Sequence, residues 1–349
     1  MKYMRQLDGV RAIAILLVFT GHWFSWAWVP TSPIGGMGVN CFFVLSGFLI
    51  TSILLQGRKA SSKAAALKNF YIRRFLRIFP LYYGVLFFFV IIGYLPVVKT
   101  FLWDLSYCTN IYIFLHGSWP FSVSHLWSLS MEEQFYLVWP YLIFFVPSRF
   151  LAPSIIFAII LSPISRIILY SMHFSIPSIT TFPLCSLDFL GFGGLLAYYR
   201  SYYPQVTWPL KKLRFYSIIA IILFFLTWML RVKGYHNLFS DISFYSLEMI
   251  FLGYFIFRAS EGFTGIAGKV LGFGPIVYIG KISYGLYVFH LIIGPIIKFK
   301  LLSLYPHLHL NELQWGAVYL TSNLAVASTS YFFYEKWFLN MKERFIKIE

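Results

Sequence analysis

The chain alternates long apolar segments with short polar ones along almost all of its 349 residues. Each apolar segment is close to the roughly 20 residues that a helix needs to cross the hydrocarbon core of a bilayer. The longest polar stretch runs only from Gln56 to about Asn69. The pattern therefore predicts one all-α, polytopic membrane domain over residues 1–349. Ten spans are expected near residues 9–29, 36–55, 76–95, 127–146, 153–172, 182–199, 214–230, 242–258, 276–297 and 314–334.

A further apolar segment, residues 101–117, leaves open an eleventh span or an interfacial helix. The distribution of positive charge helps to decide between these counts. With ten spans and a cytoplasmic N-terminus, 22 Lys and Arg residues fall on the inner side and five on the outer side, while Arg166 lies within a span. An eleventh full span would move every later loop to the opposite side of the membrane, and the excess of Lys and Arg on the inner side would disappear. We therefore expect ten spans with both termini in the cytoplasm.

The composition excludes several classes of protein. Hydrophobic residues make up 59% of the chain and charged residues only 11%, against about a quarter charged in soluble domains. The formal net charge of +16 would indicate a nucleic-acid partner in a soluble protein, but here it follows from the positive-inside rule. Cys41, Cys108 and Cys185 are isolated in the sequence, so neither a disulfide framework nor a metal site is expected. No motif for a bound cofactor or for nucleic acid is present.

Ionisable residues inside the spans are the first functional candidates, because a charge in hydrocarbon is costly unless its surroundings are polar. Arg11 and His22 are eleven residues apart, which is three helical turns plus about 20°. They should share one helix face about 16 Å apart, with Arg11 at the cytosolic edge and His22 deep in the membrane. His290 follows Lys281 by nine residues, so the two should lie on opposite faces of their helix. A structural histidine remains the alternative for both His22 and His290.

The first span, LDGVRAIAILLVFTGHW, resembles the opening helix of the acyltransferase 3 family, whose members are polytopic enzymes that acylate carbohydrates and other acceptors. Asn40 stands where many members have Asp, which puts a role for that carboxylate in doubt. Many larger members also carry an extracytoplasmic hydrolase-like domain, and we expect this chain to be a form without it. Six more blocks follow in the family's order: GVNCFFVLSGFLIT, RRFLRIFPLYY, HLWSLSMEEQFYLVWP, SLDFLGFGGLLA, ISYGLYVFH and SYFFYEK.

The resemblance implies acyl transfer and assigns roles to three residues. His22 would be the base that deprotonates an acceptor hydroxyl, or would itself accept the acyl group, since imidazole suits both tasks. Arg11 and His22 are separated by ten residues, as are the basic residue and the histidine of the family's signature, and this makes Arg11 the second candidate catalytic residue. Glu133 would orient His22 or the acceptor hydroxyl, although carboxylates at a helix start are common for electrostatic reasons alone.

The family's RRxxR block implies a site for the phosphates of acyl-CoA. Arg73, Arg74 and Arg77 are expected at the start of the third helix, where they are i,i+3 and i,i+4 neighbours. Arginine forks bind phosphate in a bidentate manner. Ordinary positive-inside anchoring is the alternative for any one of them.

Five further residues are candidates for the pocket. Trp127 and Tyr136 would stack on a sugar or anchor the helix at the membrane interface, and the second role is common for these residue types. Glu335 would close the cytosolic vestibule through Arg or Lys partners, or would be a surface carboxylate. The remaining two candidates are His125 and His290.

The expected function is transfer of acetyl from cytosolic acetyl-CoA to a hydroxyl of a surface or lipid-linked carbohydrate, such as lipopolysaccharide, at the bacterial inner membrane. Another acyl group or a non-sugar acceptor is the alternative within enzymes. A secondary transporter is the alternative of another class, since buried His, Arg and Glu can form a proton or substrate path. Transporters often contain a repeat, and none is visible in this sequence.

Overall fold

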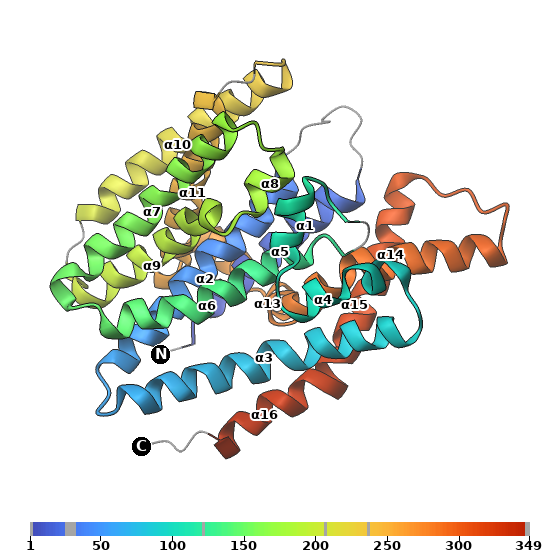
Figure 1. Ribbon diagram of the computed structural model, residues 1–349, viewed down its shortest axis with the longest axis horizontal. Coiled ribbons are helices and arrows are strands. Elements are labelled where there is room, and N and C mark those ends of the chain that lie inside the picture. Colours follow the sequence, from blue (N-terminus) through green and yellow to red (C-terminus); the bar gives the residue numbers. More distant parts are fainter. Residues whose placement is uncertain (1–2, 25–32, 121–122, 206–207, 236–237, 346–349) are drawn as a thin grey trace.

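The computed structural model describes residues 3–24, 33–120, 123–205, 208–235 and 238–345. All regular elements in these ranges are helical (Figure 1). The sixteen α-helices are α1 (Arg5–Trp23), α2 (Ile34–Arg58), α3 (Lys63–Ile91), α4 (Leu95–Leu105), α5 (Thr109–His116), α6 (Leu126–Phe145), α7 (Ser148–Ser171), α8 (Ile176–Thr181), α9 (Leu187–Tyr202), α10 (Trp208–Val232), α11 (Leu238–Glu261), α12 (Gly265–Leu271), α13 (Gly274–Lys281), α14 (Ser283–Leu304), α15 (Glu312–Ser330) and α16 (Lys336–Phe345). A short 3₁₀ turn, η1 (Pro183–Ser186), and a π-helical turn, η2 (Tyr331–Glu335), complete the list.

Each of the ten expected spans contains a helix. Within the described residues, six helices are long and apolar enough to cross a membrane, and they lie in α2, α3, α7, α10, α11 and α14. Helix α10 exposes Ile222 and Phe225, and α7 exposes Phe157, so the outside of the bundle is apolar. Such a surface needs lipid around it. The all-helical membrane fold is thus confirmed, while the count of ten spans and the cytoplasmic termini stay predictions.

The apolar segment at residues 101–117 forms no long helix. Its residues belong to α4 and α5, which have 11 and 8 residues and are separated by Ser106 to Cys108. Neither helix reaches the roughly 20 residues needed to span a bilayer. The structure therefore favours the interfacial interpretation of this segment over an eleventh span.

Helix α3 begins earlier than the sequence pattern predicts. Its N-cap is Ser62, whose hydroxyl accepts a hydrogen bond of 3.2 Å from the backbone N–H of Ala65. The polar residues that follow are good helix formers, so they extend the helix instead of forming a loop. Arg73, Arg74 and Arg77 consequently lie in the middle of α3, and their expected position at its start is wrong.

The expected span at residues 276–297 is divided into two helices. Helix α13 ends at Lys281 and α14 begins at Ser283, with Ile282 between them at φ −93° and ψ 6°. Lys281 and His290 therefore belong to different helices, and their expected placement on opposite faces of one helix is wrong. The first span also ends earlier than expected, at Trp23, while residues 25–29 lie outside the described residues.

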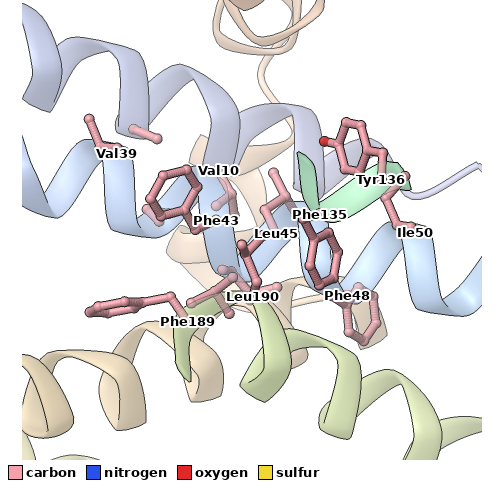
Figure 2. Close-up of a cluster of buried hydrophobic side chains, with 14 of the residues drawn as sticks. Val10, Val39, Phe43, Leu45, Phe48, Ile50, Phe135, Tyr136, Phe189 and Leu190 are labelled. Atoms are coloured by element: carbon pink, nitrogen blue, oxygen red, sulfur yellow. The ribbon is translucent and has the colours of Figure 1, made fainter. Parts of the chain in front are cut away.

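Helix α2 is the centre of the bundle and packs against α1, α3, α6, α9 and α11. Figure 2 shows Phe43 and Phe48 of α2 beside Phe189 and Leu190 of α9. The two helices approach closely at two glycines. A Cβ atom on Gly47 would lie 1.9 Å from the carbonyl oxygen of Leu190, and one on Gly193 would lie 2.0 Å from that of Val44. Small residues of this kind let membrane helices meet backbone to backbone.

The charge that the sequence places inside the span at residues 153–172 has an internal partner. Arg166 of α7 and Asp188 of α9 are both buried, with a nitrogen–oxygen distance of 2.8 Å. The same guanidinium also donates to the carbonyl of Cys185 and lies 4.5 Å from the ring centroid of Tyr245 on α11. These contacts tie α7, α9 and α11 together and offset the cost of burying the two charges.

The close approach of α2 and α9 generates the first prediction. Gly193→Ala should lower the free energy of unfolding by about 1–3 kcal/mol, because the new methyl group meets backbone that cannot rotate away. The matched control is Gly36→Ala in α2, where an added Cβ meets nothing within 4 Å. This second change should leave stability equal or raise it by up to about 1 kcal/mol. Unfolding curves in detergent measure both, and equal effects would contradict the packing argument.

Candidate active site

A cavity of about 260 Å³ lies among α1, α2, α3, α6 and α14. One part of its wall is charged and consists of Arg11, Arg74, Arg77, Glu132 and Glu133. The rest is mostly apolar side chains of α2, including Phe42, Leu45, Leu49 and Ile53. The structure thus brings together residues that lie more than a hundred positions apart in the sequence, and most of them come from the regions that the sequence singled out.

The basic part of the cavity comes from α1 and α3. Arg11 forms an ion pair with Asp8, one turn earlier on α1. Arg74 lies with its guanidinium 5.9 Å from the ring centroid of Tyr136, and its Nε atom is buried without a hydrogen-bond partner. Within the part of the chain that the structure describes, neither Arg74 nor Arg77 forms a salt bridge. Two guanidinium groups therefore face the cavity with donors to spare, which is the arrangement that an anion requires.

The acidic part of the cavity comes from the first turns of α6. Glu132 accepts hydrogen bonds from the hydroxyl of Ser46 at 2.9 Å and from that of Tyr136 at 2.7 Å. Glu133 also lines the cavity, but among the described residues it has no hydrogen-bond partner. The sequence favours Glu133 over Glu132 as a functional residue. In the structure, however, it is the Glu132 carboxylate that two hydrogen bonds hold in place. No signal in the sequence pairs Ser46 with Glu132, because the pairing depends on how α2 and α6 meet.

His22 lies outside this cavity. It belongs to the last turn of α1, where its side chain is exposed and its Nδ1 lies 2.9 Å from the carbonyl oxygen of Val18. Its expected position deep in the membrane stays a prediction, since exposure at the surface of the bundle does not give its depth. Glu133 is not a hydrogen-bond partner of His22 in the described structure, because Glu133 faces the cavity beside Arg74. The neighbours of His22 are other histidines: its ring lies 5.1 Å from that of His290.

Two hydroxyl groups lie between the cavity and the histidines. Tyr287 of α14 and Ser128 of α6 both line the cavity, and their hydroxyl oxygens are 2.5 Å apart. Each also lies within hydrogen-bond distance of the carbonyl oxygen of His125, at 3.1 Å for Tyr287 and 3.2 Å for Ser128. The ring of His125 is in turn 4.8 Å from that of His290. The cavity and the histidines are therefore neighbouring parts of one polar region, and sequence reasoning missed both connecting hydroxyls.

The remaining predicted residues divide between this region and other environments. Tyr136 lines the cavity, whereas Arg73 is exposed and is not among the lining residues. Trp127 is buried against Phe43, with ring centroids 5.9 Å apart, and does not line the cavity. Glu335 is buried and accepts a hydrogen bond of 3.1 Å from Ser330.

Glu335 lies in the π-helical turn η2. In the described ranges it forms no salt bridge with Lys or Arg, so the expected closure of a vestibule through such a partner is not seen. A π-helical turn widens the helix locally, and here it directs the carboxylate to the inside, where Oε1 would be 3.1 Å from a Cβ on Gly285. No pattern in the sequence predicts this turn.

Comparisons with known proteins show what this chain is similar to. A family model described as an acyltransferase domain matches residues 4–332. The peptidoglycan O-acetyltransferase OatA of Listeria monocytogenes is 30% identical over 83% of this chain and 49% of its own length. The putative O-acetyltransferase SAS0844 of Staphylococcus aureus is 28% identical over 83% of this chain and 50% of its own length. The putative peptidoglycan O-acetyltransferase YrhL of Bacillus subtilis is 37% identical over 40% of this chain and 23% of its own length.

The chain thus spans about half the length, or less, of these relatives. No solved structure gives a significant match to the chain.

The hydrogen bonds of Glu132 generate a prediction about stability. Tyr136→Phe keeps the ring but removes the hydroxyl that donates to Glu132, so it should lower the free energy of unfolding by about 1–2 kcal/mol. The control is Tyr305→Phe, at a side chain that is 63% exposed, which should change stability by less than about 0.5 kcal/mol. Thermal unfolding in detergent compares the two. A Tyr136→Phe variant as stable as the control would show that this bond does not hold α6 in place.

Proposed function

The chain belongs to the acyltransferase family whose domain matches residues 4–332, and on this premise we propose that it transfers an acetyl group from acetyl-CoA to a hydroxyl of a cell-surface carbohydrate. The observation that carries the proposal is that two different sites lie next to each other. An arginine-bearing apolar cavity lies on one side of Tyr287 and Ser128, and a cluster of histidines lies on the other. The first suits a thioester donor with an anionic head, and the second suits an alcohol that must lose a proton.

The cavity fits the narrow part of the donor. At about 260 Å³ it is smaller than the roughly 300–1,000 Å³ of pockets that enclose a whole drug-sized ligand. Its mostly apolar wall would accept the thin pantetheine arm, while the nucleotide stays at the mouth. Arg74 and Arg77 have unpaired donors for phosphate oxygens there, and arginine binds phosphate through two parallel hydrogen bonds. Acetyl-CoA is a substrate in this scheme, and no resident cofactor is invoked.

The histidine cluster supplies the base. His22 is exposed at the end of α1, so a hydroxyl that approaches from outside the bundle can reach its ring. Imidazole has a proton affinity suited to general base catalysis near neutral pH. His22 would remove the proton while the oxygen attacks the thioester carbonyl at the end of the pantetheine arm. Arg11, at the opposite end of α1, would serve the donor side.

The acceptor is proposed from the relatives. OatA and YrhL carry peptidoglycan in their names, so a glycan of that kind is the first acceptor to test, before lipopolysaccharide or another lipid-linked saccharide. The excess of Lys and Arg on one side supports a cytoplasmic position for both termini and for Arg74 and Arg77. This orientation would let cytosolic acetyl-CoA enter at the inner face of a bacterial inner membrane, while the glycan meets His22 from the other side.

Reconstitution tests the proposed function. In oriented proteoliposomes, acetyl-labelled CoA supplied on the cytosolic side should be cleaved, free CoA should stay on that side, and label should become covalently attached to a glycan acceptor. His22→Ala should abolish the transfer but leave the protein folded. A secondary transporter would instead move the label across the membrane unchanged. Cleavage only from the opposite side would contradict the proposed orientation and the role of the arginines.

A second test addresses the donor site. Arg74→Ala and Arg77→Ala should each raise the KM for acetyl-CoA by about tenfold with little change in kcat, because each removes a contact that substrate and transition state share. Lys68→Ala is the control, since Lys68 is an exposed cation on the same helix and does not line the cavity. Its KM should stay within about twofold of the wild type. Equal increases in all three variants would mean that the basic surface acts only through its overall charge.

A further inference from the structure

Three histidines from three distant parts of the sequence meet beside the donor cavity. They are His22 at the end of α1, His125 at the start of α6 and His290 in α14, and we call them the histidine cluster. The His290 ring is central: its centroid lies 5.1 Å from that of His22 and 4.8 Å from that of His125, and both pairs meet edge to face. His125 and His290 are 2% and 1% exposed, while His22 is open to the outside. The cluster thus leads from the exterior into the interior.

The backbone determines which nitrogen of each ring carries hydrogen. Nδ1 of His22 lies 2.9 Å from the carbonyl of Val18, and Nδ1 of His290 lies 2.6 Å from that of Tyr287. For His125 the bonded nitrogen is Nε2, 3.0 Å from the carbonyl of Val288. A carbonyl oxygen only accepts hydrogen bonds, so each of these nitrogens must be an N–H. In the neutral rings, Nε2 of His22, Nε2 of His290 and Nδ1 of His125 therefore hold the lone pairs.

Two of these lone pairs have no partner. Nε2 of His290 and Nδ1 of His125 are buried and accept no hydrogen bond from the residues that the structure describes. Buried polar atoms normally find a partner, so this arrangement calls for a donor that is absent from the resting protein. The titratable groups that act electrostatically on these two rings are other members of the cluster: His22 acts on His125, and both His125 and His22 act on His290. The described residues also show no group arranged to hold a metal ion.

We propose that the three histidines act as one base, in which His290 passes the acceptor's proton between the exposed His22 and the buried His125. The proposal rests on the proposed acetyl transfer and deepens it. Because each ring keeps its N–H on a carbonyl, the nitrogen that gains and loses the proton is the lone-pair nitrogen of each ring. Transfer from ring to ring requires only the small movement that brings two such nitrogens into hydrogen-bond distance. Imidazole is well suited to such a relay.

The chemistry balances without a further reactant. The O–H bond of the acceptor breaks and its proton goes to Nε2 of His22, while the oxygen forms a bond to the thioester carbonyl carbon. The C–S bond then breaks, and sulfur leaves with the electron pair as a thiolate. The proton reaches the buried side of the cluster through His290 and His125. There the hydroxyls of Tyr287 and Ser128 lie within hydrogen-bond distance of the backbone carbonyl of His125 and line the donor cavity, so the ring of His125 is near the cavity wall, and the thiolate takes up the proton to give free CoA. The histidines end the cycle neutral, as they began it.

Two conservative substitutions separate the relay from a structural role. His290→Asn places an amide Nδ2–H where the imidazole has Nδ1–H, so the bond to the Tyr287 carbonyl can be kept while the lone-pair Nε2 is lost. His125→Gln in the same way keeps a donor at the position of Nε2. The matched control is His116→Asn, because the exposed His116 also places Nδ1 2.8 Å from a backbone carbonyl, that of Tyr112.

With the relay, His290→Asn and His125→Gln should each lower kcat at least tenfold and leave the KM for acetyl-CoA within about twofold, since neither ring lines the donor cavity. His116→Asn should behave like the wild type. If His290→Asn retains wild-type kcat while His290→Ala loses it, the ring is only a structural hydrogen-bond donor and the proposal is overturned.

A spectroscopic measurement tests the cluster without any assay of activity. In protein labelled with ¹⁵N-histidine, the nitrogen shifts report which ring atom carries hydrogen, and single variants assign the signals. We expect Nδ1–H for His22 and His290 and Nε2–H for His125, and the opposite form at His290 would overturn the relay. A wild-type protein that shows these forms but transfers no acetyl group would instead contradict the proposed function, so the two failures are distinguishable.

Discussion

The structure depends on how the bundle deals with charge away from water. A charged side chain among apolar helices must have a partner of opposite charge or face a polar cavity, because either alternative is far less costly than exposure to hydrocarbon. Both solutions occur here. Arg166 is neutralised by Asp188 and also contacts the Cys185 carbonyl and the Tyr245 ring, so its charge has a partner within the bundle. Arg74, by contrast, keeps donors free toward a cavity. The contrast separates a structural arginine from one placed for a ligand.

Much of this arrangement follows from the local sequence. Where a prediction from the sequence fails, the reason for the failure is physical as well. Each of the ten apolar segments contains a helix, because hydrophobic length is a property of contiguous residues. Arithmetic along one helix was less reliable, since it assumes that the helix continues. The break at Ile282 put Lys281 and His290 on separate helices, and the cap at Ser62 moved the start of α3. Single residues with little weight in a hydropathy average set both boundaries.

The site was predictable in its parts but not in its grouping. The sequence singled out Arg11, Arg74 and Tyr136 as well as the three histidines, and it offered Glu133 as the residue that orients His22 or the acceptor hydroxyl; of these two roles, only the pairing with His22 concerns a contact within the protein. That pairing came from the resemblance and could not be checked by spacing, because the two residues lie on different helices. Which residues share a cavity depends on the contact of α2 with its neighbours, where Gly47 and Gly193 let backbones touch. The bond between Ser46 and Glu132 depends on a second such contact, that of α2 with α6.

Helix α14 connects the two halves of the site and holds them at a constant separation. Tyr284, Tyr287 and His290 follow one another at intervals of three residues. Each side chain is therefore rotated by about 60° around the helix axis from the one before it. Tyr284 donates to the carbonyl of Ile78 on α3 at 2.8 Å, which ties α14 to the helix that carries the arginines. Tyr287 borders the donor cavity, and His290 reaches the end of α1. A shift of α14 along its axis would move Tyr287 and His290 together. The separation between this part of the cavity wall and His290 is therefore set by one rigid helix, which is the kind of support that precise positioning of two groups needs.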